Sequence, residues 1–252
     1  MPVSFPAHQG IIGPVKLRWP DRVDGTALCI SAASPDLAYA LGPWLHQYGH
    51  SLVGVVVFCV PFTLVAAWLT RWRAASGIFA ALPDLGPLRI RSYRVLGQRR
   101  PRFLVTVGSA LLGAGSHVAI DSFTHTGRWG ANLLGINGVF MTVPTRGEFN
   151  GARVLQYLGH TLGSLAFVLL LLVISRRGLL EEWYGEAVVA RARSVTASRS
   201  RQVAFFVLTF GPTVAAARFA DDLGVNRLFF PVLVLTMCVL LAGAALAPDR
   251  EN

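Results

Sequence analysis

Charge is scarce in this chain. Asp, Glu, Lys and Arg together make up 14% of its 252 residues, against roughly 25% in ordinary soluble domains. Hydrophobic residues make up 53%. A soluble globular domain is therefore excluded, and the composition indicates an integral membrane protein.

Cysteine is also scarce, and the three residues, Cys29, Cys59 and Cys238, lie in apolar segments without paired spacing. That spacing gives no support to a disulfide framework or a thiolate metal site. The chain lacks a P-loop, a dinucleotide-binding glycine fingerprint and a Gly-x-Ser-x-Gly elbow, which removes the usual signatures of nucleotide-dependent enzymes and serine hydrolases. No cleavable signal peptide is evident, so we expect the membrane spans to direct insertion.

Long apolar runs are abundant instead. A bilayer-spanning helix needs about 20 residues, and five stretches reach or approach that length: 51–70, 103–121, 154–174, 203–219 and 228–247. A sixth, 25–43, is weaker because Ser34-Pro35-Asp36 interrupts it, and proline disfavours helix in the residue before it. The sequence predicts an all-α polytopic transmembrane bundle of about six membrane segments, the first of them broken or re-entrant.

The arginines predict the topology. Residues 71–102 contain eight arginines against the single acid Asp84, and residues 175–202 contain six, whereas residues 122–153 contain three. By the positive-inside rule the first two loops are cytoplasmic and the third is outside. Both termini are then expected on the cytoplasmic side.

The net charge of +10 therefore serves mainly topology and contact with anionic lipid, and nucleic acid is not an expected partner. The same pattern divides the chain into three parts. We expect a membrane core over 1–175, a charged cytoplasmic connector over 176–202 and a C-terminal transmembrane hairpin over 203–252.

The sharpest chemical pattern is His117, Asp121 and His125, spaced four residues apart at the end of an apolar run. On a helix these side chains share one face, and polar groups at such a position are costly to desolvate, which favours a functional role. The outer two are separated by about 12 Å of rise, so one ion would take a neighbouring pair. Asp121 between two pairs could also bridge two ions.

The predicted topology brings other polar residues to the same extracytoplasmic depth, namely Asp36, His50 and His160. The remaining ligands are expected from Asp36, His50 and His8, and imidazole with carboxylate suits zinc, manganese or iron as the divalent ion. Several alternatives stay open. The stripe could be a structural hydrogen-bond network, Asp36 a helix cap, His160 a partner of a backbone carbonyl, and His46 an interfacial polar residue.

The order of four separated motifs carries a resemblance: His8, then Ser34-Pro35-Asp36, then Gly49-His50-Ser51, then His117-x-x-x-Asp121-Ser-Phe-Thr-His125. Over about residues 1–175 it resembles a bacterial multipass membrane family catalogued only as a domain of unknown function (domain of unknown function 4184). It is more distantly similar to inner-membrane proteins classed as metal-dependent hydrolases. The last two spans are expected to lie outside the resemblance.

The resemblance implies a bacterial inner-membrane location and one metal site formed by His8, Asp36, His50, His117, Asp121 and His125. His8 conflicts with the six-span topology, in which it starts on the cytoplasmic side while the others gather outside. Either the N-terminal segment enters the bilayer differently, for instance as a re-entrant pair broken at Pro35, or His8 is not a ligand.

The leading functional expectation is a metal-dependent membrane hydrolase acting on a lipid-like or amphiphilic substrate. Asp121 and one or two histidines would hold the ion, and His50 or Asp36 would serve as a ligand or general base. One alternative is metal-assisted lyase or cyclase chemistry on an isoprenoid. Another is a non-enzymatic sensor, transporter or assembly factor, since histidine titrates near neutral pH. The sequence specifies neither the substrate nor the oligomeric state.

Overall fold

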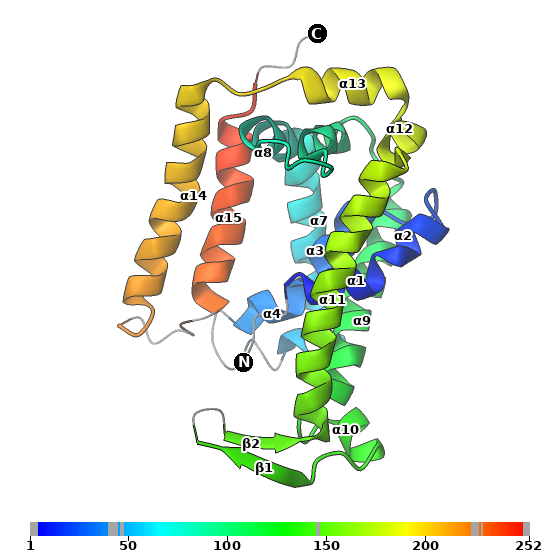
Figure 1. Ribbon diagram of the computed structural model, residues 1–252, viewed down its shortest axis with the longest axis vertical. Coiled ribbons are helices and arrows are strands. Elements are labelled where there is room, and N and C mark those ends of the chain that lie inside the picture. Colours follow the sequence, from blue (N-terminus) through cyan, green and yellow to red (C-terminus); the bar gives the residue numbers. More distant parts are fainter. Residues whose placement is uncertain are drawn as a thin grey trace.

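The computed structural model describes residues 5–39, 45, 48–144, 147–222, 227 and 229–248. Long helices run along its longest axis (Figure 1). Among the described residues four helices are long and apolar enough to cross a membrane, which marks a membrane protein: Leu52–Ala81, α9 (Phe103–Thr124), α11 (Gly151–Arg176) and α14 (Arg199–Phe219). A shorter apolar helix, α15 (Phe229–Ala245), follows α14.

The helix from Leu52 to Ala81 is not regular throughout. It consists of α6 (Leu52–Gly54), the π-helical turn η1 (Val55–Cys59), α7 (Val60–Leu69), a second π-helical turn η2 (Thr70–Ala74) and α8 (Ala75–Ala81). Ser51 caps its start, because its hydroxyl oxygen accepts from the Gly54 N–H at 3.0 Å. Each π-helical turn shifts the residues that follow to a new face. The second one carries Arg71 inward, where its side chain is buried.

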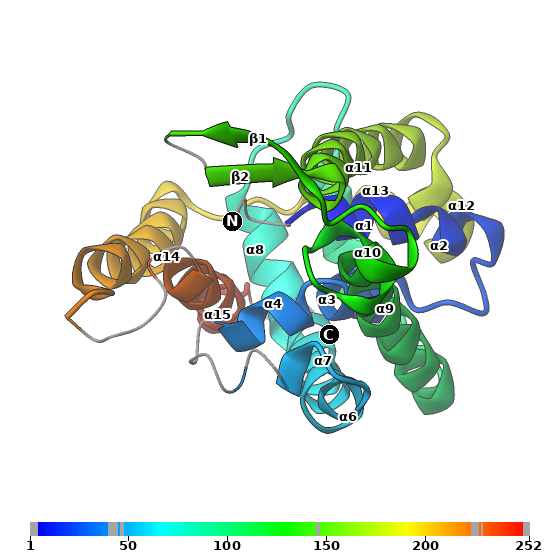
Figure 2. The ribbon, with the colours of Figure 1, turned by 90° about the horizontal axis from the view of Figure 1, so that it is seen from below.

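The N-terminal residues form a hairpin of short helices rather than a span. α1 (Ala7–Ile12) and α2 (Pro14–Arg18) run one way, and α3 (Gly25–Ser31) and α4 (Ser34–Tyr39) return. Seen along the long axis, α3 and α4 lie at the centre of the molecule, between α9 and α15 (Figure 2). The predicted break in the first segment is confirmed, between α3 and α4 and just before Pro35. The predicted count of six membrane segments is not confirmed.

Two ion pairs place the turn of this N-terminal hairpin near the arginine-rich loop. Arg99 Nη2 lies 3.8 Å from Asp21 Oδ1, and Arg71 Nη2 pairs with the Asp24 carboxylate. The Asp24 oxygens also accept from the Thr26 N–H, the Ala27 N–H and the Thr106 hydroxyl. One buried carboxylate therefore caps α3 and joins it to η2 and α9.

The close approach of α1 to α11 fixes the depth of the N-terminal hairpin. A Cβ on Gly10 would lie 1.9 Å from the carbonyl oxygen of Gly163, and one on Gly163 would lie 2.6 Å from the carbonyl oxygen of Ala7. Small residues at such crossings let helix backbones touch in a bilayer. Because Gly163 stands near the middle of α11, α1 and its His8 lie well away from the arginine-rich loop.

We expect Gly163→Ala to destabilise the folded protein by about 1 to 3 kcal/mol, since the added methyl group forces α1 away from α11. The thermal unfolding midpoint in detergent micelles measures the effect. Gly159→Ala is the matched control. Gly159 lies on the same helix as Gly163, and a Cβ added there meets no atom within 4 Å. Equal midpoints for the two variants would contradict this packing.

One end of the molecule carries a small sheet, which an all-α fold does not include. β1 (Val139–Val143) pairs antiparallel with β2 (Gly147–Asn150), with Thr142 opposite Glu148, and α10 (Trp129–Leu133) lies beside them (Figure 1). The glycines and asparagines of this segment favour turns, so the sequence did not predict its two short strands. Asn150 ends the sheet and caps α11, because its Oδ1 accepts from the Arg153 N–H at 2.9 Å.

The opposite end carries the arginine-rich loop and the connector (Figure 1). The connector forms α12 (Leu179–Tyr184) and α13 (Glu186–Ser194), and Leu180 and Val189 pack with Val95 of the 3₁₀ helix η3 (Ile90–Gly97). Asp84 accepts from the Arg91 N–H and the Arg193 guanidinium. Partial burial disfavours the charged form of Asp84, but these two donors hold its pKa below the usual value.

The C-terminal hairpin joins the rest of the bundle through α15. Gly77 of α8 and Gly243 of α15 touch backbone to backbone, with a Cβ on Gly77 only 1.9 Å from the Gly243 carbonyl oxygen. The Arg73 guanidinium donates to the carbonyl oxygens of Ala244 and Ala247. The last described residues therefore lie near the arginine-rich loop.

Candidate metal centre

The last turns of α9 supply two of the predicted side chains. His117 Nε2 and Asp121 Oδ2 lie 3.3 Å apart, as expected for residues four apart on one helix face. His117 is fully buried and Asp121 nearly so. The helix ends at Thr124, and His125 has left helical geometry with φ −118° and ψ 130°. The helical part of the stripe is therefore the pair His117 and Asp121.

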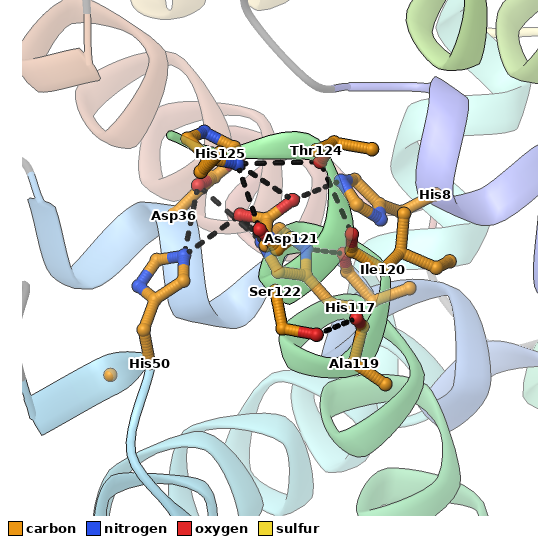
Figure 3. A network of polar contacts seen from close by, with 12 residues as sticks. His8, Asp36, His50, His117, Ala119, Ile120, Asp121, Ser122, Thr124 and His125 are labelled. Atoms are coloured by element: carbon orange, nitrogen blue, oxygen red, sulfur yellow. Dashed lines mark hydrogen bonds and ion pairs between the residues drawn. The ribbon is translucent and has the colours of Figure 1, made fainter. Parts of the chain in front are cut away.

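Two other segments complete a group of four. Asp36 comes from α4, and His50 precedes the start of α6. His50 Nε2 lies 3.3 Å from Asp121 Oδ2 and 3.6 Å from Asp36 Oδ1, and His117 Nε2 lies 3.5 Å from the same Asp36 oxygen. One ligand atom from each of the four residues lies within 4.8 Å of the others (Figure 3). The structure thus brings Asp36, His50, His117 and Asp121 into one cluster that could hold a metal ion.

These separations fit ligands around an ion better than direct contacts. Hydrogen bonds between an imidazolium and a carboxylate are about 2.7 to 2.9 Å long, and the four contacts here run from 3.3 to 3.6 Å. Zinc binds nitrogen and oxygen ligands at about 2.0 to 2.2 Å, so neighbouring ligands in a tetrahedron stand about 3.3 to 3.6 Å apart. Four of the six separations between the donor atoms therefore match a tetrahedral site, and all six lie within 4.8 Å.

The orientation of His117 also suits ligation. Its Nδ1 lies 2.8 Å from the carbonyl oxygen of Ala32, and a carbonyl only accepts, so Nδ1 carries the proton. Nε2 is left with a lone pair aimed into the cluster, and it has no hydrogen-bond partner although it is buried. Metal-binding histidines are commonly oriented through their other nitrogen in this way. Ala32 stands at the break between α3 and α4, so the broken segment positions this ring.

His8 joins the cluster from the side opposite His50 (Figure 3). Its Nε2 lies 3.4 Å from Asp121 Oδ1, and its ring stacks on that of His117 with centroids 3.8 Å apart. The N-terminal hairpin accounts for this position. Its turn lies near the arginine-rich loop, whereas its two ends, α1 with His8 and α4 with Asp36, both reach Asp121. The conflict between His8 and the six-span topology disappears with the first span.

The remaining histidines have different surroundings. His125 Nδ1 faces the Asp121 carbonyl oxygen at 3.2 Å and the Asp121 carboxylate at 3.7 Å, while its Nε2 lies 2.9 Å from Gln156 Nε2. His160 of α11 stands edge-on to His8, with ring centroids 6.4 Å apart. His46 lies outside the described residues.

Two features of this region were absent from the sequence-based expectations. Gln156, on the second turn of α11, contacts His125, and a lone glutamine near a helix start carries no signal of that role. The second is the pair formed by Asp24 and Arg71, of which the sequence-based topology used only the positive charge of Arg71. Its available signal was an acidic residue directly before the helical run 25–31, which is a typical N-cap position.

The fold and the site together define a class of protein: a helical membrane protein with a buried cluster of histidine and aspartate side chains. The chain belongs to the family described as Domain of unknown function (DUF4184), which matches residues 1–248. The match extends well past residue 175, so the C-terminal hairpin lies within the family region, contrary to expectation. No curated protein and no solved structure matches the chain.

Proposed function

We propose that this protein is a metal-dependent hydrolase of the bacterial inner membrane that acts on a lipid-like, amphiphilic substrate. The observation that carries the proposal is the buried cluster of Asp36, His50, His117 and Asp121, placed beside a large apolar cavity. The positive-inside rule puts the arginine-rich loop in the cytoplasm. The cluster then faces the extracytoplasmic half of the bilayer.

The cavity supports a lipid-like substrate. It has a volume of about 1190 Å³, whereas sites for ordinary small ligands measure about 300 to 1,000 Å³. Its apolar wall is built by the N-terminal hairpin, α7, α11 and α15, with side chains such as Phe62, Leu170 and Leu235. The C-terminal hairpin thus contributes one wall of the space in which an acyl or isoprenoid chain would lie.

Asp36 connects the cavity with the cluster. It is the member of the cluster that lines the cavity, and its side chain is 17% exposed, against 0% for His117 and 9% for Asp121. A bound divalent ion would polarise the scissile group and make water more acidic. Asp36 stands where it can accept a proton from water at the cavity wall, which suits a general base. With Asp36 as the base, His50, His117 and Asp121 would be the three ligands of the ion, which leaves its fourth position open for water.

Purified protein should retain at least one equivalent of zinc, manganese or iron at neutral pH, and should release product from long-chain esters or phosphodiesters in vesicles. Turnover should fall at least about 10-fold for short-chain, water-soluble analogues, because the apolar cavity then contributes no binding. Leu235→Trp, which fills the cavity, should reduce turnover of the long-chain substrate while leaving metal content unchanged. Metal analysis and product quantification measure both effects.

Leu241→Trp is the control, since Leu241 lies on the same helix with a 54% exposed side chain and does not line the cavity. A metal-free wild type would overturn the proposal. Bound metal without turnover of any lipid would reject the hydrolase and favour the sensor or transporter alternative.

A further inference from the structure

The end of the cavity away from Asp36 carries charged side chains of its own. Arg71 and Asp24 line it but neutralise each other as a buried pair. Among the described residues at this end, five cations remain against one carboxylate, that of Asp21, whose side chain is 81% exposed. The five cations, which we call the cationic mouth, are Lys16, Arg22, Arg99, Arg100 and Arg102.

The cationic mouth is far from the metal centre. Arg102 directly precedes α9, whereas Asp36 lies next to Asp121 near the other end of that helix. The helical rise of about 1.5 Å per residue places Arg102 and Asp121 about 28 Å apart along α9. The two ends of the cavity can therefore bind polar groups of different ligands.

Three segments meet at the cationic mouth. Lys16 and Arg22 belong to the N-terminal hairpin, and the three remaining arginines belong to the loop between η3 and α9. α12 joins them through Trp183. The Lys16 ammonium lies 4.9 Å from the centre of the Trp183 ring, and the Trp183 carbonyl oxygen accepts from Arg99 Nη1 at 3.1 Å. Tryptophan is enriched where a bilayer meets water, so the mouth stands at the level of lipid headgroups.

Three arginines of the mouth have unused donors. Arg22, Arg100 and Arg102 are exposed, and their guanidinium groups make no hydrogen bond or ion pair with any residue that the structure describes. A guanidinium fork matches two phosphate oxygens at once. Three such groups around one opening favour a phosphate as the ligand.

Lys16 adds a partly buried charge to the mouth. Its ammonium donates to two backbone carbonyl oxygens of its own hairpin, which leaves one of its three donors. Burial lowers the pKa of Lys16 and the charge of Arg99 lowers it too, although Asp24 and Asp21 raise it. A bound anion would offset the repulsion between the two cations.

One polar group of the cavity wall lacks a partner. Tyr93 of η3 lines the cavity, and its hydroxyl is buried without a hydrogen bond to any described residue. Buried polar groups normally have a partner, so each exception calls for an explanation. η3 leads directly into the loop that carries Arg99. A ligand that enters through the cationic mouth would supply an acceptor for this hydroxyl.

We infer that the cationic mouth binds the phosphate of an anionic glycerophospholipid, whose acyl chains lie along the apolar wall of the cavity. The arginine forks and Lys16 bind the phosphate oxygens, and the Tyr93 hydroxyl donates to an ester carbonyl oxygen. A free anion would leave the apolar wall without a partner. Clusters of Lys and Arg beside a span attract anionic lipid. Because the mouth is far from Asp121, the inference does not depend on the proposed hydrolase.

The test is the retention of radiolabelled phosphatidylglycerol by immobilised protein in mixed detergent micelles, with phosphatidylcholine as the zwitterionic comparison. Wild type should bind phosphatidylglycerol at least about 10-fold more tightly than phosphatidylcholine. The triple variant Arg22→Gln, Arg100→Gln, Arg102→Gln should lose at least about 10-fold of its affinity for phosphatidylglycerol. All three side chains are exposed, so we expect the variant to fold, and its thermal unfolding midpoint checks this.

The matched control removes the same charge from the same end of the molecule. Its substitutions are Arg176→Gln, Arg177→Gln and Arg191→Gln, at exposed arginines that do not line the cavity. This variant should retain phosphatidylglycerol as the wild type does. An equal loss of affinity in both variants, or equal affinity of the wild type for the two lipids, would overturn the inference.

Inorganic phosphate separates a lipid from a soluble anion. An excess of phosphate, matched in ionic strength by sodium chloride, should leave phosphatidylglycerol bound, because its acyl chains contribute to binding. Displacement by phosphate but not by chloride would assign the mouth to a soluble anion and reject the lipid. Lipid retention is measured on protein treated with a chelator, so a failed hydrolase and a failed lipid site give separate results.

Tyr93→Phe removes only the hydroxyl and should weaken phosphatidylglycerol binding about 5-fold, the effect of one hydrogen bond. The same retention assay measures it. Unchanged affinity in Tyr93→Phe would overturn the contact between this hydroxyl and the lipid ester.

Discussion

Replacing Asp121 with asparagine will lower the affinity of the protein for a divalent ion by at least about 100-fold. The substitution preserves the shape of the side chain but removes the negative charge that His50, His117 and His8 all face within 3.4 Å. An amide is also a much weaker ligand than a carboxylate. Equilibration with chelator-buffered Zn²⁺, followed by metal analysis, measures the loss.

Asp221→Asn is the control for this experiment. Asp221 pairs with Arg227 between α14 and α15, and its side chain is 53% exposed, so removing its charge should leave metal affinity unchanged. Hydrolysis by Asp121→Asn should fall together with the metal content. Wild-type affinity in Asp121→Asn would reject Asp121 as a ligand and with it the proposed metal centre.

The largest effect on stability is expected from Asp24→Asn, at about 3 to 5 kcal/mol. Asp24 is 2% exposed and Arg71 is 9% exposed, so the variant leaves a buried guanidinium without its counter-charge. It also weakens the acceptors for the α3 N-terminus and for Thr106. The free energy of unfolding in mixed micelles, titrated with a denaturing detergent, measures the loss.

Two comparisons separate the charge effect from general damage. Asp21→Asn, three residues away, should change stability by less than about 1 kcal/mol, since Asp21 is 81% exposed and 3.8 Å from Arg99. The double variant Asp24→Asn with Arg71→Met should regain much of the loss, because no charge is then left buried. A double variant as unstable as Asp24→Asn alone would show that the pair is not the cause.

The long spans could be predicted because their signal is local. A run of about 20 apolar residues forms an α-helix in a bilayer, because its backbone groups must then bond to one another. α9 and α11 begin and end within a few residues of the predicted limits. The His117 and Asp121 pair followed from helix periodicity for the same reason. The small sheet and the N-terminal hairpin could not be predicted, because they consist of short elements. The length and apolarity of such elements do not determine whether they form a span, a short helix or a strand.

The convergence of the centre depended on contacts that no local pattern encodes. His8 reaches Asp121 because Gly10 and Gly163, far apart in sequence, permit backbone contact between α1 and α11. His117 is oriented by the carbonyl of Ala32, which is available because the chain breaks between α3 and α4. The motif order predicted which residues lie close together, whereas tertiary packing decided which of their atoms face one another.

The position of His8 in the chain also fixes the order in which the residues around Asp121 are synthesised. His8 leaves the ribosome more than 100 residues before Asp121 and more than 150 before Gly163. At about 5 to 20 residues per second, the N-terminal hairpin waits several seconds or longer for the helices it packs against. The cluster of Asp36, His50, His117 and Asp121 is complete only once α9 has been made, so an ion at this cluster would bind after these segments have been synthesised and could not guide their insertion.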